Sequence, residues 1–241
     1  MSIGVFDSGI GGLTVLDALK KRLPRESFVY FGDTANVPYG DKSETEVCDL
    51  AVEAVRFLEK QGVKAIVIAC HTVSACAFSR LQSHAKVPLF EIISAGVQEV
   101  VSHVPLKCVA VMATKRTVES SVYRMRIAKE LKGVHVVQVP CPRLVPLIEK
   151  GVDASDVIPI LREDLDVVIE NHCDVLLLGC THFPYLIDAF KACIDVPILS
   201  PEMRFADMVA QGLANFNLEA DAALTQRCFQ FFSKPIQCKW R

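Results

Sequence analysis

The chain has 241 residues, 51% hydrophobic and 22% charged, and its 26 basic and 28 acidic side chains leave a net charge of -2 at pH 7. This composition is typical of a globular protein of one or two domains and argues against disorder. Because the charges are balanced and well mixed, there is no basic field of the kind that attracts nucleic acid or anionic lipid. We therefore expect a small-molecule ligand, with neither nucleic acid nor a membrane as partner.

The first residues, Met1–Phe6, read directly as a strand, without the charged lead and apolar run of a signal peptide. Apolar runs such as Ala65–Cys70 have the length of a strand and are too short to span a membrane. Ten cysteines are scattered along the chain rather than grouped as in a short secreted scaffold. These features predict a cytoplasmic protein with reduced thiols.

Short apolar runs rich in Val and Ile alternate with longer amphipathic stretches, which is the pattern of parallel strands covered by helices. The predicted fold class is α/β. Strands are expected at Ile3–Phe6, Ser27–Phe31, Ala65–Ala69, Leu89–Ile92, Val109–Met112, Val134–Val139, Val175–Leu178 and Ile198–Leu199. Helices are expected near Leu13–Leu23, Ser43–Gln61, Ser74–Leu81, Ala95–Val101, Val118–Leu131, Asp156–Asn171, Pro184–Ala192 and Arg204–Asn217.

Three strand-end landmarks recur at nearly constant spacing along the chain. Ile3–Ser8 parallels Val109–Thr114 (109 - 3 = 106), Ala65–Cys70 parallels Val175–Cys180 (180 - 70 = 110), and Val87–Leu89 parallels Val196–Ile198 (196 - 87 = 109). Such echoes also arise by chance among α/β proteins. We nevertheless predict two similar α/β halves with mostly parallel sheets, which face each other across an active-site cleft lined by strand ends. The first domain would comprise residues 1–94 plus 205–241, and the second residues 95–204.

The segment Asp7–Gly12 follows the first strand and opens a helix, as a phosphate-binding loop does. It does not match the dinucleotide fingerprint, because Thr14 stands where the third glycine belongs. Two interpretations remain open: exposed amides after Ser8 that bind a carboxylate, or a capping turn. A second polar loop, Gly32–Gly40, follows the second strand and reads either as a functional loop or as an ordinary one.

Two short polar motifs leave buried strands at equivalent places: Cys70-His71-Thr72 and Cys180-Thr181-His182. A thiol at such a strand-to-helix junction feels the helix dipole, which we expect to lower its pKa from about 8.5 and make it a usable acid or base. Six of the remaining thiols are interpreted as inert small hydrophobic side chains. They are Cys48, Cys76, Cys108, Cys173, Cys193 and Cys228.

Metal binding is a weaker interpretation of these motifs, because they lack the paired-cysteine spacing of structural zinc sites. A single Cys-His nucleophile is another, and it leaves one cysteine unexplained. One thiol on each wall of a cleft suits racemisation, in which a proton leaves one face of a carbon and returns on the other. Glu149, expected near a helix start, is read as a solvated or capping carboxylate when taken alone.

Taken together, the motifs Asp7-Ser8-Gly-Ile-Gly-Gly, Gly32-Asp33-Thr34, Pro38-Tyr39-Gly40, Cys70-x-Thr72 and Gly179-Cys180-Thr181-His182 resemble those of glutamate racemase, within the aspartate/glutamate racemase family. The resemblance covers nearly the whole chain. It implies an enzyme without cofactor or metal that interconverts L- and D-glutamate and supplies D-glutamate for bacterial peptidoglycan, and hence for cell-wall biogenesis and cell shape.

The resemblance also implies roles for individual residues. Cys70 and Cys180 would be the two acid/base residues, with Asp7 assisting Cys70, His182 assisting Cys180, and Glu149 helping on the second side. Substrate binding would fall to Asp7, Ser8, Pro38, Tyr39, Gly40, His71, Thr72, Thr117, Thr181 and His182.

Two positions depart from the family pattern. His71 stands where the family has Asn, and Ser200 stands where it favours Asp. A bulkier, ionisable side chain at position 71 leaves open a racemase for aspartate or for acidic amino acids broadly, or a homologue that binds ligand without turnover. A single-cysteine hydrolase or transferase is a further alternative, and a homodimer is left open.

Overall fold

The computed structural model describes residues 1–218 and 227–234, and its strands form two parallel sheets. The first sheet has the order β4-β3-β1-β2-β9 and the second the order β6-β5-β7-β8. The strands are β1 (Ile3–Asp7), β2 (Phe28–Gly32), β3 (Ala65–Ile68), β4 (Leu89–Glu91), β5 (Cys108–Ala113), β6 (His135–Pro140), β7 (Val175–Gly179), β8 (Ile198–Leu199) and β9 (Cys228–Phe232). The eight predicted strands are confirmed, and β9 was missed.

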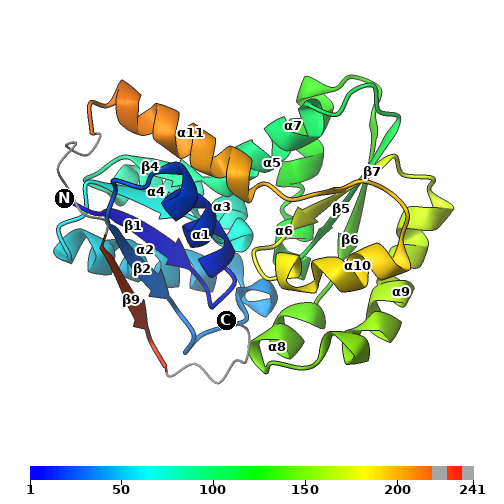
Figure 1. Ribbon diagram of the computed structural model, residues 1–241, viewed down its shortest axis with the longest axis horizontal. Coiled ribbons are helices and arrows are strands. Elements are labelled where there is room, and N and C mark those ends of the chain that lie inside the picture. The colour runs from blue at the N-terminus through cyan, green and yellow to red at the C-terminus, as the bar shows by residue number, and fades with distance from the viewer. Residues whose placement is uncertain (219–226, 235–241) are drawn as a thin grey trace.

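The two sheets repeat one topology. Reading the second sheet from its other edge gives β8-β7-β5-β6, which matches β4-β3-β1-β2 strand for strand. The predicted α/β fold with two similar halves is therefore confirmed, and Cys70 and Cys180 follow the equivalent strands β3 and β7. Figure 1 shows the two halves side by side, with β1 and β7 both running toward the middle of the molecule.

The sheets are covered on both faces by helices, which is why their central strands are apolar except for Asp7 at the end of β1. Every residue of β3 and β7 is buried. The helices are α1 (Leu13–Arg22), α2 (Glu44–Lys60), α3 (His71–Cys76), α4 (Phe78–His84), α5 (Ile92–Val101), α6 (Lys115–Glu119), α7 (Val122–Glu130), α8 (Leu144–Glu149), α9 (Ala154–Glu170), α10 (Ile187–Cys193) and α11 (Glu202–Asn215). Two 3-10 helices, η1 (Tyr39–Asp41) and η2 (Phe183–Leu186), lie in loops.

Several predicted helices are divided or shifted. The stretch predicted from Ser74 to Leu81 is two helices, α3 and α4, which meet at Ala77. The stretch predicted from Val118 is broken at Ser121, whose φ of 56° lies in the left-handed region between α6 and α7. Glu149 was expected near a helix start, and it is instead the last residue of α8, a helix that the sequence analysis did not predict.

Helix α5 joins the two halves through its two faces. Ile92 and Ala95 belong to the core beneath the first sheet, whereas Ile93 and Val97 pack in a core of the second. The predicted boundary at 94/95 thus falls inside a helix shared by both halves, and the division into domains stays a prediction. Residues 219–226 and 235–241 of the proposed first domain lie outside the described residues.

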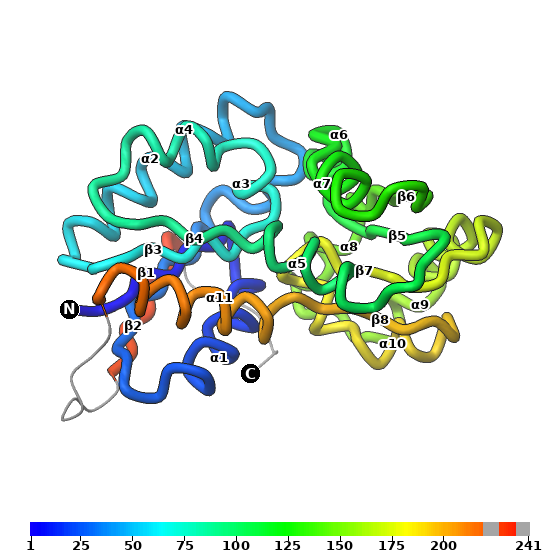
Figure 2. The backbone as a smooth tube through the Cα atoms, turned by 90° about the horizontal axis from the view of Figure 1, so that it is seen from above, coloured from blue at the N-terminus to red at the C-terminus, as the bar shows by residue number. Residues whose placement is uncertain are grey.

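The chain returns to the first half after β8. Helix α11 packs against α1 and α5, as Figure 2 shows from above, and β9 adds a parallel strand beside β2. Within the described ranges, no helix is long and apolar enough to cross a membrane.

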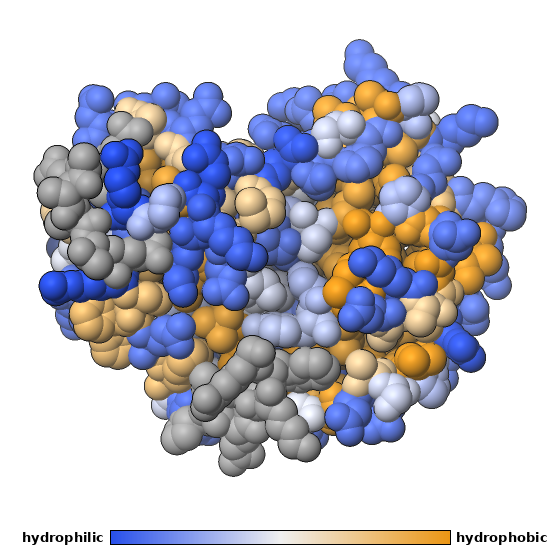
Figure 3. Space-filling model, viewed as in Figure 1, coloured by the Kyte–Doolittle hydropathy of each residue, from blue (hydrophilic) through white to orange (hydrophobic). Residues whose placement is uncertain are grey.

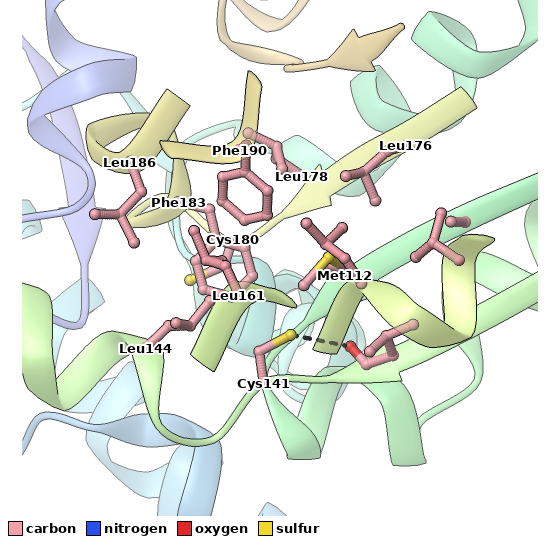
Figure 4. Close-up of a cluster of buried hydrophobic side chains, with 14 of the residues drawn as sticks. Met112, Cys141, Leu144, Leu161, Leu176, Leu178, Cys180, Phe183, Leu186 and Phe190 are labelled. Carbon is pink, nitrogen blue, oxygen red and sulfur yellow. Dashed lines mark hydrogen bonds between the residues drawn. The ribbon is translucent and has the colours of Figure 1, made fainter. Parts of the chain in front are cut away.

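The core of the second half reaches the end of β7 that carries Cys180. Figure 4 shows Met112 of β5, Leu176 and Leu178 of β7 and Phe190 of α10 packed together, with Cys180 in the same cluster. Nearby, the Cys141 thiol donates to the carbonyl oxygen of Val139 at 3.5 Å. The Cys180 side chain therefore packs against a close-packed apolar core, which restricts the positions that its sulfur can take.

Candidate active site

Asp7, the last residue of β1, is completely buried and bonds to both halves of the protein. Its Oδ2 accepts from the backbone N–H of Gly9 at 3.0 Å, and its Oδ1 accepts from the hydroxyl of Thr181 at 3.1 Å. Burial raises the pKa of Asp7, while the nearby His182 and these hydrogen bonds act in the opposite direction. Asp7 thus ties the carboxyl end of the first sheet to that of the second.

Cys70 lies at the start of α3, directly after β3, and is 4% exposed. Its thiol donates to the hydroxyl of Ser8 at 3.5 Å. Burial and the negative charge of Asp7 raise the pKa of Cys70 to about 12, and Cys180 contributes in the same direction. The expected lowering by the helix dipole is therefore wrong for Cys70, because a six-residue helix supplies less stabilisation than burial and Asp7 remove.

Cys180 lies beside an imidazole that is itself held by a carboxylate. The Cys180 sulfur is 3.9 Å from Nδ1 of His182, and Nε2 of His182 is 2.6 Å from Oε1 of Glu149. Burial opposes protonation of His182, but its bonds to Cys180 and Glu149 and the charges around it outweigh burial and raise its pKa well above the ordinary value. The Glu149 side chain thus favours the protonated form of the imidazole that lies beside the Cys180 sulfur.

Three threonine hydroxyls form a cluster between the halves. Thr72 of α3 lies 2.9 Å from the Thr114 hydroxyl and 3.4 Å from that of Thr117, and these last two are 2.9 Å apart. All three side chains are buried. Such a cluster offers hydroxyl donors to a carboxylate without adding a positive charge.

The glycine loop after β1 is built for close approach to the second half. A Cβ atom on Gly11 would lie 2.4 Å from Nδ1 of His182 and 2.5 Å from Oγ1 of Thr181. The adjacent Ile10 N–H donates to Oε1 of Glu149 at 3.0 Å. In this structure the loop amides are bonded by side chains of the protein: the Gly9 N–H by Asp7, as in a capping turn, and the Ile10 N–H by Glu149. Binding of a ligand carboxylate by this loop stays a prediction.

The Pro38-Tyr39-Gly40 segment meets the second half through its backbone. A Cβ atom on Gly40 would lie 2.7 Å from Cβ of Thr114. The Tyr39 hydroxyl is not directed to the thiols, because it donates to Oδ2 of Asp33 at 2.7 Å. Pro38 precedes η1 in an extended conformation, with φ of -87° and ψ of 140°.

His71 is buried, and its ring is engaged on one side only. Its Nδ1 lies 2.8 Å from the hydroxyl of Tyr123 in α7, whereas its Nε2 has no hydrogen-bond partner among the described residues. Burial lowers the pKa of His71 to about 3, so the ring is neutral at physiological pH. The other departure, Ser200, donates to the buried Glu202 carboxylate at 2.5 Å.

Most of the predicted residues are therefore connected. Asp7, Thr181, His182, Cys180 and Glu149 share one hydrogen-bonded network, and Ser8 and Cys70 form a separate pair. Thr72 and Thr117 belong to the hydroxyl cluster, and His71 lies beside Cys70 in sequence. Their roles stay predictions. Sequence reasoning missed Thr114 and Tyr123; Thr114 ends the run that parallels Ile3–Ser8 and so had a signal, whereas Tyr123 had none. Within residues 1–218 and 227–234, no group of three or more His, Cys, Asp or Glu side chains is placed to hold a metal ion.

Fold and site together define an α/β protein of two repeated halves, with a thiol at the same strand end of each. Residues 3–203 match the sequence model of the Asp/Glu/Hydantoin racemase family. Glutamate racemase 3 of Caldanaerobacter subterraneus subsp. tengcongensis is 40% identical over 220 residues, which are 90% of this chain and 80% of that protein.

Solved structures give the same picture. The glutamate racemase from Francisella tularensis subsp. tularensis SCHU S4, solved in complex with D-glutamate, has a TM-score of 0.90 and 36% identity, and covers 97% of this chain and 88% of its own. An aspartate racemase from Picrophilus torridus, at 17% identity and a TM-score of 0.59 over 89% of this chain and 95% of its own, shares the fold alone. The chain belongs to the Asp/Glu/Hydantoin racemase family and is an amino-acid racemase, an isomerase.

Proposed function

We propose that this protein interconverts L- and D-glutamate, with Cys70 and Cys180 as the two acid/base groups. The observation that carries the proposal is the equivalence of the two thiols, which follow β3 and β7 in matching sheets joined by the Asp7–Thr181 hydrogen bond. The names of the relatives, and the D-glutamate in the Francisella complex, support glutamate as the substrate.

The chemistry requires one thiolate and one thiol. When Cys70 is the thiolate, its sulfur takes the α-proton from one face of the amino acid while the Cys180 thiol delivers its proton to the opposite face. The products are a neutral Cys70 thiol, a Cys180 thiolate and the opposite enantiomer, so that no proton is gained or lost overall. The reverse reaction begins from this second state.

The side chains around each sulfur support this assignment. In the ligand-free protein Cys70 is a thiol, because its pKa is about 12. The ammonium group of a bound amino acid would bring a positive charge next to Cys70 and Asp7 and so favour the Cys70 thiolate. On the other side, Glu149 favours a protonated His182, and a proton on that ring would stabilise a Cys180 thiolate. The hydroxyls of Thr72, Thr114 and Thr117 would hold a substrate carboxylate and the charge that develops on it.

Proton exchange at Cα tests this function directly. Incubation of the protein with L-glutamate in D2O is expected to replace the α-proton by deuterium, seen by NMR, and to bring the optical rotation to zero. The same assay with L-aspartate addresses the alternative substrate, and faster exchange of aspartate would overturn the choice of glutamate. Thermal stabilisation by glutamate without any exchange would instead indicate a homologue that binds and does not turn over.

The two-thiol mechanism and the biological role need separate tests. Cys70→Ser and Cys180→Ser are each expected to abolish racemisation, whereas a single-cysteine mechanism predicts that one of them stays active. We further propose that the D-glutamate serves peptidoglycan synthesis in the cytoplasm. Growth of a D-glutamate auxotroph on expression of this chain would support that role, and continued dependence on added D-glutamate would contradict it.

A further inference from the structure

Two cysteines lie against each other at the end of the second sheet opposite the site. Cys108 is the first residue of β5 and Cys173 lies two residues before β7, and their sulfurs are 2.9 Å apart. Both side chains are buried, at 6% and 5% exposure. Cys180 follows the other end of β7, so this pair takes no part in the proposed proton transfers.

The backbone on both sides of the pair is fixed by hydrogen bonds. The Asp174 N–H donates to the Cys108 carbonyl at 2.9 Å, and the Asp174 carboxylate accepts from the N–H of Cys108 at 2.8 Å. The Cys173 N–H donates to the carbonyl of Val168 at 3.2 Å. Since a disulfide has its sulfurs about 2.05 Å apart, the two sulfurs need to approach by less than about 1 Å, within the reach of side-chain rotation.

A hollow on the surface leads to one member of the pair. It has a volume of about 300 Å³ and is lined by Cys173 together with Val168, Ile169, His172, Cys193 and Ile194, among others. It lies between the ends of α9 and α10, in the half of the molecule where Figure 3 shows apolar side chains gathered on the visible face. A small oxidant therefore has a route to Cys173, whereas Cys108 does not line the hollow.

We propose that Cys108 and Cys173 form a site of reversible thiol oxidation, at which a low-molecular-weight disulfide produces an intramolecular disulfide between the amino ends of β5 and β7. This proposal departs from the interpretation of both thiols as inert. It goes beyond the racemase function and does not depend on it.

The reaction is two thiol–disulfide exchanges. The Cys173 thiolate attacks one sulfur of the small disulfide, forms a mixed disulfide and releases one small thiolate. The Cys108 thiolate then attacks the Cys173 sulfur and releases the second small thiolate. The two protein thiols lose two protons and two electrons, and the small disulfide takes them up as two thiols. Burial and the hydrogen bond with Cys108 raise the pKa of Cys173 to about 12, so oxidation is slow at neutral pH and accelerates with rising pH.

Peptide mapping after oxidation tests the site. The full chain is incubated with oxidised glutathione at pH 8.5, quenched with acid, digested without reduction and analysed by mass spectrometry. The expected result is a linked peptide pair containing Cys108 and Cys173 that disappears after dithiothreitol. A Cys173–Cys193 link, or a Cys173–glutathione adduct that is never resolved by Cys108, would overturn the proposal, as would an unmodified pair when other thiols have reacted.

A stability measurement provides a second readout that does not require activity. The disulfide would close a loop across 65 positions, so oxidation is expected to raise the Tm by about 5 °C or more. Cys173→Ala is expected to lose this rise. The matched control is Cys48→Ala, a buried thiol whose sulfur contacts a backbone oxygen of Cys76, and it is expected to keep the rise. An equal rise of the Tm on oxidation in Cys173→Ala and Cys48→Ala would overturn the proposal. If Cys173→Ala fails to fold, the peptide mapping of the unmodified sequence is the deciding test.

Discussion

The ring of His71 and the hydroxyl of Tyr123 form a buried pair, with Nδ1 of the ring 2.8 Å from the hydroxyl oxygen. Because Nε2 of the ring has no hydrogen-bond partner among the described residues, the arrangement with fewest unpaired groups has the Tyr123 hydroxyl donating to Nδ1 and a proton on Nε2 of the neutral ring. This arrangement leaves one buried N–H donor on the residue that follows Cys70 in sequence.

A double-mutant cycle measures the coupling within this pair. Tyr123→Phe and His71→Asn are each expected to lower the free energy of unfolding by about 1–3 kcal/mol, because each leaves a buried partner unsatisfied. The double variant is expected to lose less than the sum of the two, in urea denaturation at pH 7.5. Strict additivity would show that the two groups do not interact.

The low pKa of His71 makes stability depend on pH in a defined direction. The unfolded His71 takes up a proton below its ordinary pKa of about 6.5, whereas the folded one resists protonation down to about 3. The unfolded state therefore binds more protons between these two pH values. The contribution of His71 to the free energy of unfolding is complete above pH 6.5 and is lost as pH drops toward 3. Comparing urea midpoints at pH 7 and pH 4.5, His71→Asn is expected to lose less stability than the unmodified protein. An equal loss of stability in both proteins would show that the pH dependence comes from other groups, such as Asp7 or His182.

Alkylation of Cys70 reports the effect of Asp7. Burial and the Asp7 charge hold the Cys70 pKa at about 12 in the ligand-free protein, so iodoacetamide should modify Cys70 slowly at pH 7 and faster as pH rises. Asp7→Asn removes the charge, lowers the pKa of Cys70 and is expected to speed its alkylation several-fold at pH 8, read by mass spectrometry. Asp17→Asn, on α1, is the control. A rate unchanged by Asp7→Asn would contradict the electrostatic cause.

The protonation of His182 should depend on Glu149. Glu149→Gln keeps an oxygen that can accept from Ile10, while removing the negative charge 2.6 Å from Nε2 of His182. The pKa of His182 is expected to fall, measured by NMR titration of the imidazole resonances, and the pH profile of racemisation should shift with it. Glu53→Gln, whose carboxylate pairs with an exposed arginine on α2, should move neither. An unchanged His182 titration in Glu149→Gln would show that Glu149 does not control the protonation of His182.

Local patterns were sufficient for the strands and for the repeat, because buried parallel strands are continuous apolar runs that end at turn residues. They were insufficient where a distant partner decides the structure. β9 is an aromatic edge strand defined by pairing with β2, about 200 positions away. Helix α8 is only six residues long and contains Pro146, so it has no clear helical pattern. The Cys70 pKa was predicted in the wrong direction because Asp7 and the extent of burial are tertiary facts. The Tyr123 contact with His71 crosses 52 positions between two halves and has no local signature.

Gly11 should be essential for the geometry of the site rather than for the fold. In Gly11→Ala the new methyl group would lie 2.4 Å from Nδ1 of His182 and 2.5 Å from the Thr181 hydroxyl, so the loop and the second half must move apart. A displacement of about 1 Å in a catalytic arrangement can cost a factor of about 100 in rate, and we expect kcat/KM to fall by at least that factor. Gly133→Ala is the matched control: Gly133 has φ of +83° with no atom within 4 Å of an added Cβ, so it should lose about 1 kcal/mol of stability while keeping its kinetics. The contrary result is a loss of kcat/KM in Gly11→Ala no greater than that in Gly133→Ala at equal loss of stability. The close approach of the glycine loop to His182 would then serve folding alone and would not align the two sides of the site.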